Sequence, residues 1–410
     1  MSVSLDSVRE LDRQDPLANF KQHFALPEGV LYLDGNSLGA QPKAAKQAVD
    51  DTLDQWRDEL IKGWNQGWFD APERLGNLLA PIIGAKKGEV SVTDNITLNI
   101  FKLLGYILGQ DTGGRRRAVL SEGGNFPTDG YIAQGYCRVS GTEHRFLPEG
   151  GDLAEHLEGV AVVVLSQVNY RTGKLRDMAA TTQLVHDHGA DVIWDLAHSA
   201  GALPIDLNGS GVRYAVGCTY KYLNGGPGAP AFLYVHGNCQ NGGWQPLSGW
   251  HGHAAPFAFE ADYNPASDIS RFRTGTHSAL TYAALEASLV MWNEVDMHAL
   301  RAKSLAMSDL FRECLADIFT AHDIEDITPA ANQRGSQVSL VDTQNGYAIV
   351  QALIARNVIG DYREPGLMRF GFTPLYLSFE DVWQAAQHFR EVIESGEYRS
   401  PEFHVRGAVT

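Results

Sequence analysis

Residues 214–228 read YAVGCTYKYLNGGPG, so that a short apolar run leads into a lysine and then into a glycine-rich turn. The run Tyr214–Cys218 is typical of a buried strand of a mostly parallel sheet. Lys221 follows at the predicted strand end, where a desolvated lysine loses its proton readily, as Schiff-base chemistry requires. The alternative is an ordinary lysine whose stem lies along apolar surface. Because lysine is scarce in the central part of the chain, we favour the functional interpretation.

The sequence upstream repeats this pattern of short apolar runs, separated by helical stretches. One such stretch, Thr181–His188, begins with two threonines that predict an N-terminal cap. Strands that alternate with helices are typical of an α/β fold, in which ligands bind beyond the carboxyl ends of the strands. The predicted strands before residue 200 are Ala118–Leu120, Val160–Leu165 and Val192–Trp194.

Side chains of different chemistry follow these predicted strands. Asp129 comes after the first strand, Ser166 after the second, and Asp195 and His198 after the third. With Lys221 they bring carboxylate, hydroxyl, imidazole and amine groups to one edge of the sheet, as a cofactor site requires. The carboxylate of Asp195 would stabilise a protonated ring nitrogen of a cofactor. The alternative role for Asp195 is a helix N-cap for the turn at 197–200.

The stretch Ser91–Ile100 is predicted to be a loop that opens a helix. Backbone N–H groups at such a helix start, together with the hydroxyl of Thr97, would bind an anion such as a phosphate. An ordinary capping motif without a ligand is the alternative.

The pattern changes after about residue 280. Long amphipathic helices are predicted at Ala283–Met297 and Ala299–Ile318, followed by a mixed region and a final helix near Glu380–Ser395. We therefore predict a large domain at residues 41–285 and a small C-terminal domain at residues 286–410. The N-terminal segment, residues 1–40, is expected to pack on the small domain.

Composition limits the partners of the chain. Its 410 residues include 33 Lys and Arg and 49 Asp and Glu, a formal net charge of −16, which disfavours nucleic acid and anionic membranes as partners. The one dense basic run, Arg115–Arg117, is interpreted as a solvated loop before a strand. No apolar segment is long enough to span a membrane, and the N-terminus lacks the apolar core of a signal peptide.

The spacing of cysteine, glycine and histidine residues argues against several classes of cofactor and metal site. The four cysteines form no Cys-x-x-Cys pair, so neither a zinc cluster nor a redox motif is predicted, and we expect a reducing, cytoplasmic compartment. No Gly-x-Gly-x-x-Gly follows a predicted strand, which argues against a nicotinamide-dependent oxidoreductase. His251 and His253 have no third ligand at suitable spacing, so no metal is expected.

With these motifs the sequence resembles the pyridoxal-phosphate (PLP) enzymes of fold type I, in the class V aminotransferase group, and within it the kynureninase family. The resemblance covers nearly the whole chain. Its most specific part is the stretch 217–228, whereas the Asp-x-x-His step at 195–198 is shared with cysteine desulfurases. One departure is His251, where relatives often carry an aromatic residue. The other matching segments are 32–39, 125–129, 168–173, 194–201, 248–250 and 368–376.

The resemblance implies a fold and a set of roles. The large domain would contain a mostly parallel seven-stranded sheet with helices on both faces, and the C-terminal domain would be a smaller α+β unit. Lys221 would carry PLP as a Schiff base and move the substrate α-proton, and Arg369 would clamp the substrate α-carboxylate through two hydrogen bonds. The other implied cofactor contacts are Ile96, Thr97 and Tyr220 at the phosphate, Phe126 over the ring, Asp195 at the ring nitrogen with Asp129 nearby, Ser166 and His198 from their strand ends, and Trp250 and Thr276 from the neighbouring subunit of a homodimer with shared sites.

The reaction that the resemblance implies is the hydrolysis of L-kynurenine to anthranilate and L-alanine, in tryptophan degradation. Tyr220 is our candidate for the acid and base of this reaction, and the alternative is a hydrogen bond to the phosphate alone. Trp64 would border the aryl end of the substrate and leave little room for a ring hydroxyl, so kynurenine is expected to be preferred over 3-hydroxykynurenine. Core packing or a dimer interface is the alternative for Trp64.

Two other functions on this fold are open at this stage. A cysteine desulfurase or an aminotransferase is the nearest, but a desulfurase needs a nucleophilic cysteine on a mobile loop. Cys239 is the one candidate for it, because Cys314 lies in a helical pattern. A catalytically silent PLP-fold binding protein is the other, and the intact Lys221, Asp195 and Arg369 argue against it.

Overall fold

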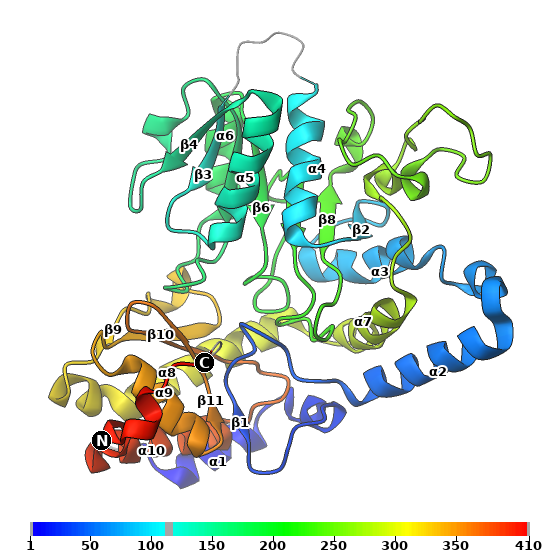
Figure 1. The fold of residues 1–410 in the computed structure, drawn as a ribbon. Coiled ribbons are helices and arrows are strands. Elements are labelled where there is room, and N and C mark those ends of the chain that lie inside the picture. The colour runs from blue at the N-terminus through cyan, green and yellow to red at the C-terminus, as the bar shows by residue number, and fades with distance from the viewer. Residues whose placement is uncertain (1–2, 111–117, 408–410) are drawn as a thin grey trace.

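A seven-stranded sheet forms the centre of the larger part of the computed structural model, which describes residues 3–110 and 118–407 (Figure 1). The predicted basic run at 115–117 lies outside these residues. In spatial order the strands are β2 (Val90–Val92), β8 (Phe232–Val235), β7 (Tyr214–Gly217), β6 (Asp191–Asp195), β5 (Val160–Ser166), β3 (Ala118–Glu122) and β4 (Glu143–Leu147). The strands from β7 to the β4 edge pair in parallel, and β8 alone in this sheet runs antiparallel to both of its neighbours, so the predicted mostly parallel sheet is confirmed.

Helices cover both faces of this sheet because its central strands are apolar on both sides. Every residue of β5 is buried. Val162 and Val164 pack in one cluster with residues of α4 and α5, while Val163 and Leu165 pack in the other with residues of α3, α6 and α7. These helices are α3 (Ala71–Leu79), α4 (Ile96–Leu108), α5 (Pro127–Ser140), α6 (Met178–Asp187) and α7 (Ala279–Trp292).

The start of α6 corrects a sequence prediction. The helix begins at Met178, with Asp177 as its N-cap, whose side chain accepts a hydrogen bond from the Ala180 amide at 3.0 Å. The predicted threonine cap is wrong because Thr182 is buried inside the helix. Its hydroxyl accepts a hydrogen bond from Trp194 Nε1 on β6 at 3.0 Å. This hydroxyl, which the sequence predicted as a helix cap, therefore binds a residue of the sheet instead.

The C-terminal part contains a four-stranded antiparallel sheet covered by helices. The first two predicted helices exist with shifted bounds, as α7 and α8, and the final predicted helix is confirmed as α10, which begins with a capping box at Ser378 and Asp381. The strands in order are β12 (Asp361–Arg363), β13 (Leu367–Gly371), β10 (Gln337–Val341) and β9 (Glu325–Asp326), and the helices are α8 (Met297–Ala321), α9 (Gly346–Ala355) and α10 (Phe379–Ser395).

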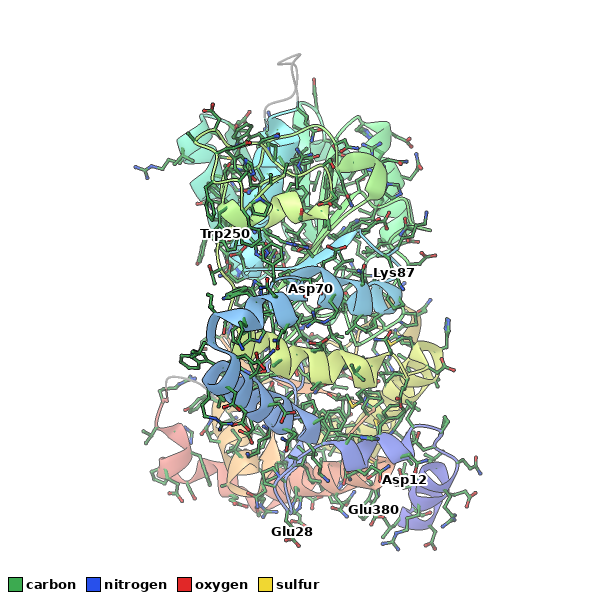
Figure 2. All side chains as sticks on the ribbon, turned by 90° about the vertical axis from the view of Figure 1, so that its right-hand side faces the viewer. Asp12, Glu28, Asp70, Lys87, Trp250 and Glu380 are labelled. Carbon is green, nitrogen blue, oxygen red and sulfur yellow. The ribbon has the colours of Figure 1, made fainter. Side chains whose placement is uncertain are left out.

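The N-terminal segment contacts both parts of the molecule. Helix α1 (Leu5–Arg13) lies against α10, where Asp12 Oδ2 accepts a hydrogen bond from the Glu380 amide at 2.9 Å, and Figure 2 shows these two residues together. Strand β1 (Leu31–Tyr32) pairs with β11 (Val358–Ile359), and α2 (Lys43–Glu59) extends to one side (Figure 1). The domain boundaries themselves stay a prediction.

Gly39, between β1 and α2, brings this segment to the lysine turn. Its amide donates to the Tyr220 carbonyl at 2.8 Å, and a Cβ added there would lie 2.2 Å from the Lys221 carbonyl oxygen. Only glycine permits so close an approach. In the described part of the chain, we find no helix with the length and apolar character that a bilayer-spanning segment needs.

Candidate active site

The ends of β5, β6 and β7, the start of α4 and the small sheet meet around a cavity of about 310 Å³. Most of the residues singled out from the sequence line it, although they come from distant parts of the chain. Those residues are Ile96, Thr97, Phe126, Asp129, Ser166, Asp195, His198, Tyr220, Lys221 and Arg369.

Lys221 lies in a tight turn after β7. The turn is closed by hydrogen bonds from the Asn224 amide to the Lys221 carbonyl (3.0 Å) and from the Gly225 amide to the Thr219 carbonyl (2.9 Å). The amine Nζ is 2.9 Å from His198 Nε2. Burial, and then the charge of Lys221, hold the pKa of His198 well below its usual value. The neutral imidazole therefore accepts a hydrogen bond from the amine.

Asp129 and Asp195 form a pair of buried carboxyl groups. Asp129 Oδ2 accepts from Asn125 Nδ2 at 2.8 Å, and Asp195 Oδ1 accepts from the Ala197 amide at 2.8 Å. Burial and the charge of Asp195 raise the pKa of Asp129, and burial also raises that of Asp195, although the charge of Lys221 opposes the latter shift. Asp195 thus caps the following turn and faces the cavity, so its two proposed roles are compatible. Because neighbouring buried carboxylates repel each other, the pair favours a cationic ligand.

The start of α4 provides a site for an anion. Asn95 is the N-cap, and its Oδ1 accepts from the Leu98 amide at 3.0 Å. Ile96 and Thr97 form the first turn, where amides have no intrahelical partner, and both residues line the cavity.

A buried lysine behind this turn was missed by sequence reasoning. Lys102 Nζ is fully buried, forms an ion pair with Asp94, and donates to the Phe272 carbonyl at 2.7 Å. Asp94 also accepts from Thr274 Oγ1 at 3.1 Å, so it joins the start of α4 to the loop that leads to Thr276. The available signal was a single lysine in an otherwise apolar helical stretch.

Arg369 lies on β13 beside a second arginine that the sequence analysis did not single out. Its Nε donates to Asp361 Oδ1 at 2.7 Å, its Nη2 also binds Asp361, and its Nη1 donates to the Tyr170 carbonyl at 2.6 Å. Arg363 also lines the cavity, with Nη2 2.9 Å from Asp361 Oδ2. The i, i+2 spacing of Asp361 and Arg363 in one strand was the signal for this group.

Three predicted residues do not line the cavity of their own chain. The ring of Trp64, in the 3₁₀ turn Leu60–Gln66, is 5.6 Å from that of His277, which stacks on His251 at 5.4 Å. Trp250 also stacks on His251, with ring centroids 5.1 Å apart, and Thr276 is exposed next to His277. These rings form an aromatic cluster on the face where Figure 2 labels Trp250 and Asp70. Sequence reasoning could not bring them together.

Other side chains bear on the alternatives. Cys239, the desulfurase candidate, lies in a short 3₁₀ turn and does not line the cavity, and Cys314 is buried in α8. His251 Nε2 is 3.1 Å from the Phe69 carbonyl oxygen. Residues 3–110 and 118–407 contain no group of three potential ligands arranged for a metal ion.

The donor set of the cavity fits PLP. The helix start suits a phosphate, the carboxyl pair suits a protonated ring nitrogen, and the Lys221 amine suits an aldehyde. Phe126 lies beside this amine, with its ring centre 6.0 Å from Nζ, where it can cover a flat ring. His198 Nδ1 is buried without a hydrogen-bond partner among the described residues, which leaves it a donor for a bound group.

Comparisons with known proteins find relatives along nearly the whole chain. A family model described as the kynureninase C-terminal domain matches residues 300–389. Kynureninases of Burkholderia pseudomallei (strain 1106a) and Pseudomonas fluorescens are 49% and 48% identical, over 98% of this chain and 98% of each relative.

Solved structures support the fold alone. A cysteine desulfurase of Escherichia coli has a TM-score of 0.78 at 17% identity, over 92% of this chain and 98% of that one. A variant of the protein C-DES with glycine covalently linked to its PLP cofactor has a TM-score of 0.77 at 21% identity, over 90% of this chain and 98% of that one.

Proposed function

The chain belongs to the kynureninase family, whose members are PLP-dependent hydrolases acting on a carbon–carbon bond, and we propose that the cavity residues described above catalyse that reaction on L-kynurenine. The observation that carries the assignment of residues is the Lys221 amine, hydrogen-bonded to a neutral His198 and facing a buried carboxyl pair. PLP carries the three groups that suit this cavity: an aldehyde for the lysine, a cationic ring for the carboxyl pair and a phosphate for the helix start.

Each group of residues would hold one part of the cofactor. Lys221 would bind PLP covalently, Asp195 and Asp129 would face its ring nitrogen, and Ile96 and Thr97 would bind its phosphate. When bound, PLP supplies a cationic ring that accepts the electrons released as bonds to the substrate's α- and β-carbons break.

The protein's own groups would orient the substrate and move protons. Arg369 would hold the α-carboxylate, and Lys221 Nζ would take the proton from the α-carbon, with His198 orienting the amine. The electrostatic interaction with the Cys218 thiol, and then burial, raise the pKa of Tyr220, so its hydroxyl stays protonated at neutral pH. Tyr220 can therefore donate to the γ-carbonyl oxygen as water adds to the γ-carbon. The Cβ–Cγ bond would then break as the hydrate gives up a proton to Tyr220, and the β-carbon would gain a proton in return, which gives anthranilate and alanine.

One experiment tests both the cofactor and its attachment. The purified protein is expected to absorb visible light as a PLP enzyme, to lose this absorbance on borohydride treatment, and to carry the label on Lys221 by mass mapping. Incubation with L-kynurenine should then release fluorescent anthranilate and alanine. A colourless protein, or a label on another lysine, would contradict the assignment.

The aromatic cluster supports a homodimer with shared sites. Trp64, Trp250 and Thr276 lie together on one face and away from the cavity of their own chain, as expected if they complete the site of a neighbouring subunit. Mixing Lys221→Ala and Trp250→Ala chains tests this directly. If the sites are shared, mixed dimers have one intact site, and activity should return to about one quarter of the native value. No recovery in a protein that sediments as a dimer would argue for separate sites.

Trp64 supports a preference for the smaller substrate. Its indole packs edge-on against Trp68 and His277 and cannot easily move aside for a ring hydroxyl. We expect a higher kcat/KM for L-kynurenine than for 3-hydroxykynurenine, and a smaller difference in Trp64→His. A native preference for the hydroxylated substrate would refute this role.

The cysteines support a reducing compartment such as the cytoplasm. All four are free, and three of them are buried. Cell fractionation with an antibody to the chain tests this placement, and recovery from an oxidising compartment would contradict it.

A further inference from the structure

The hydrogen bonds of Arg369 leave it too few donors for the predicted two-bond clamp. A guanidinium has five N–H groups. Nε and Nη2 are bound to Asp361, Nη2 also approaches Ser37 Oγ at 3.4 Å, and Nη1 donates to the Tyr170 carbonyl at 2.6 Å. With the described residues as partners, these bonds leave a single N–H, on Nη1, for a ligand. The substrate carboxylate therefore needs a second donor unless one of these buried bonds breaks.

Arg363 is placed to supply that donor. Strand pairing sets Asp361 opposite Arg369, and Arg363 follows on the same face of β12 because strand residues alternate. Arg363 lines the cavity and is 39% exposed, whereas Arg369 is almost fully buried. Its Nη2 is bound to Asp361 and its Nη1 to the Tyr362 carbonyl at 2.7 Å, which leaves Nε and one hydrogen on each Nη for a ligand.

Asp361 holds the two arginines together. It is fully buried and accepts from Arg369, Arg363 and Ser37 Oγ, the last at 2.8 Å. Burial alone would raise its pKa, but the bonds to Arg369 and the charges of both arginines outweigh this and keep the carboxylate ionised. Asp361 and the two arginines by themselves carry an excess of one positive charge, which the substrate carboxylate would neutralise.

We propose that Arg363 binds the substrate α-carboxylate together with Arg369, and that Asp361 is the positioning residue that holds both guanidiniums at the cavity wall. The inference rests on the proposed function, since it concerns the amino-acid end of the same substrate. It replaces the two-bond clamp by Arg369 alone with one hydrogen bond from Arg369 and the rest from Arg363.

The test uses Arg363→Met in the PLP-loaded enzyme. Arg363 is partly exposed, so the variant is expected to fold and to keep the visible spectrum of bound PLP. Loss of hydrogen bonds between charged groups should lower kcat/KM for L-kynurenine about ten- to a hundredfold, mainly through KM. Arg363→Lys, which keeps the charge, should recover part of the loss. Arg356→Met, at an arginine that binds surface glutamates, is the matched control and should be unchanged.

Spectral titration with L-alanine and with L-alaninamide separates binding from general damage. The amide lacks the carboxylate, so Arg363→Met should weaken binding of L-alanine and leave that of L-alaninamide unchanged. An equal loss for both compounds, or no loss for either, would overturn the role of Arg363. If the native protein binds no PLP, the proposed function fails instead, and the two failures are distinct.

Asp361→Asn tests the positioning role. It should raise KM for L-kynurenine, and combining it with Arg363→Met should give less than the product of the two single effects, because both act on one carboxylate site. Independent effects that multiply would mean that Asp361 supports the fold alone.

Discussion

Two pairs of carboxyl groups lie at the cavity or behind the residues that line it, and they differ in whether a cation binds a member of the pair directly. Asp34 and Asp361, on the small-sheet side, face two guanidiniums that bind Asp361 directly. Asp129 and Asp195, on the side of the large sheet, accept hydrogen bonds from neutral groups, and the Lys221 amine is bound to His198 instead. The pKa of Asp361, the carboxylate that the guanidiniums bind, is therefore lowered, whereas burial raises the pKa values of Asp34, Asp129 and Asp195.

The difference indicates which pair serves a ligand and which serves the protein. Asp361 is already neutralised, so its arginines can attract an external anion. The Asp129–Asp195 pair is costly in the protein alone and becomes favourable with a cationic ring beside it. An amino-acid substrate joined to PLP brings both charges, a carboxylate for one side and a pyridinium for the other.

Asp195→Asn should have the largest effect, because it removes the charge that would face the ring nitrogen. Breaking a buried charge pair costs about 3 kcal/mol or more, so we expect turnover to fall at least about a hundredfold. Asp129→Asn is the control within the same pair and should cost less. Near-native turnover of Asp195→Asn with PLP fully bound would refute the claim that this carboxyl pair serves the cationic ring.

Tyr220→Phe should keep the cofactor and slow turnover about a hundredfold, as expected for loss of a general acid. Anthranilate release at saturating L-kynurenine measures this, and the visible spectrum reports the cofactor. Near-normal turnover would mean that the hydroxyl binds phosphate alone.

Lys102→Met should weaken PLP binding about tenfold, since Asp94 would lose the charge that holds the start of α4. Equilibrium dialysis of PLP measures it, with Lys46→Met on the exposed face of α2 as the matched control. If a folded variant has unchanged PLP affinity, the ion pair of Lys102 and Asp94 does not contribute to phosphate binding.

Asp34 should give the smallest effect, a dependence on pH. Burial, and then the charge of Asp361, raise its pKa to about 7. Below this pH Asp34 is neutral and the arginine side keeps its excess positive charge. Above it the carboxylate cancels that charge, so KM for L-kynurenine should rise a few-fold as pH increases through about 7. Asp34→Asn should remove this rise.

The same shift affects the fold. Because Asp34 binds its proton more tightly in the folded chain than in the unfolded chain, stability should decrease as pH rises from about 4 to about 7. Thermal unfolding at several pH values measures this decrease, and Asp34→Asn should flatten it. The charged neighbours are Asp361, Arg363 and Arg369, and Tyr32, Tyr222 and Tyr376 also lie close enough to interact.

The strand ends could be predicted because they follow from local pattern and parallel geometry. Apolar runs mark β3, β5, β6 and β7, and parallel strands bring their carboxyl ends to one edge. Ser166, Asp195, His198 and Lys221 therefore meet as expected. The start of α6 was misplaced because the hydroxyl of a threonine is used by a tryptophan on the sheet.

The arginine side could not be predicted in the same way. Ser37 and Asp361 are 324 positions apart, and their hydrogen bond depends on how the N-terminal segment crosses the small sheet. The two-bond clamp was predicted for Arg369 because the sequence does not show that Asp361 and Tyr170 already accept hydrogen bonds from its guanidinium.

By itself the sequence determined the α/β class, the strand ends and the lysine turn, because each depends on neighbours a few residues apart. Tertiary structure alone decided how charges are balanced around the cavity. A carboxylate's ionisation depends on burial and on the cations within a few ångströms, and chain segments far apart in the sequence supply both.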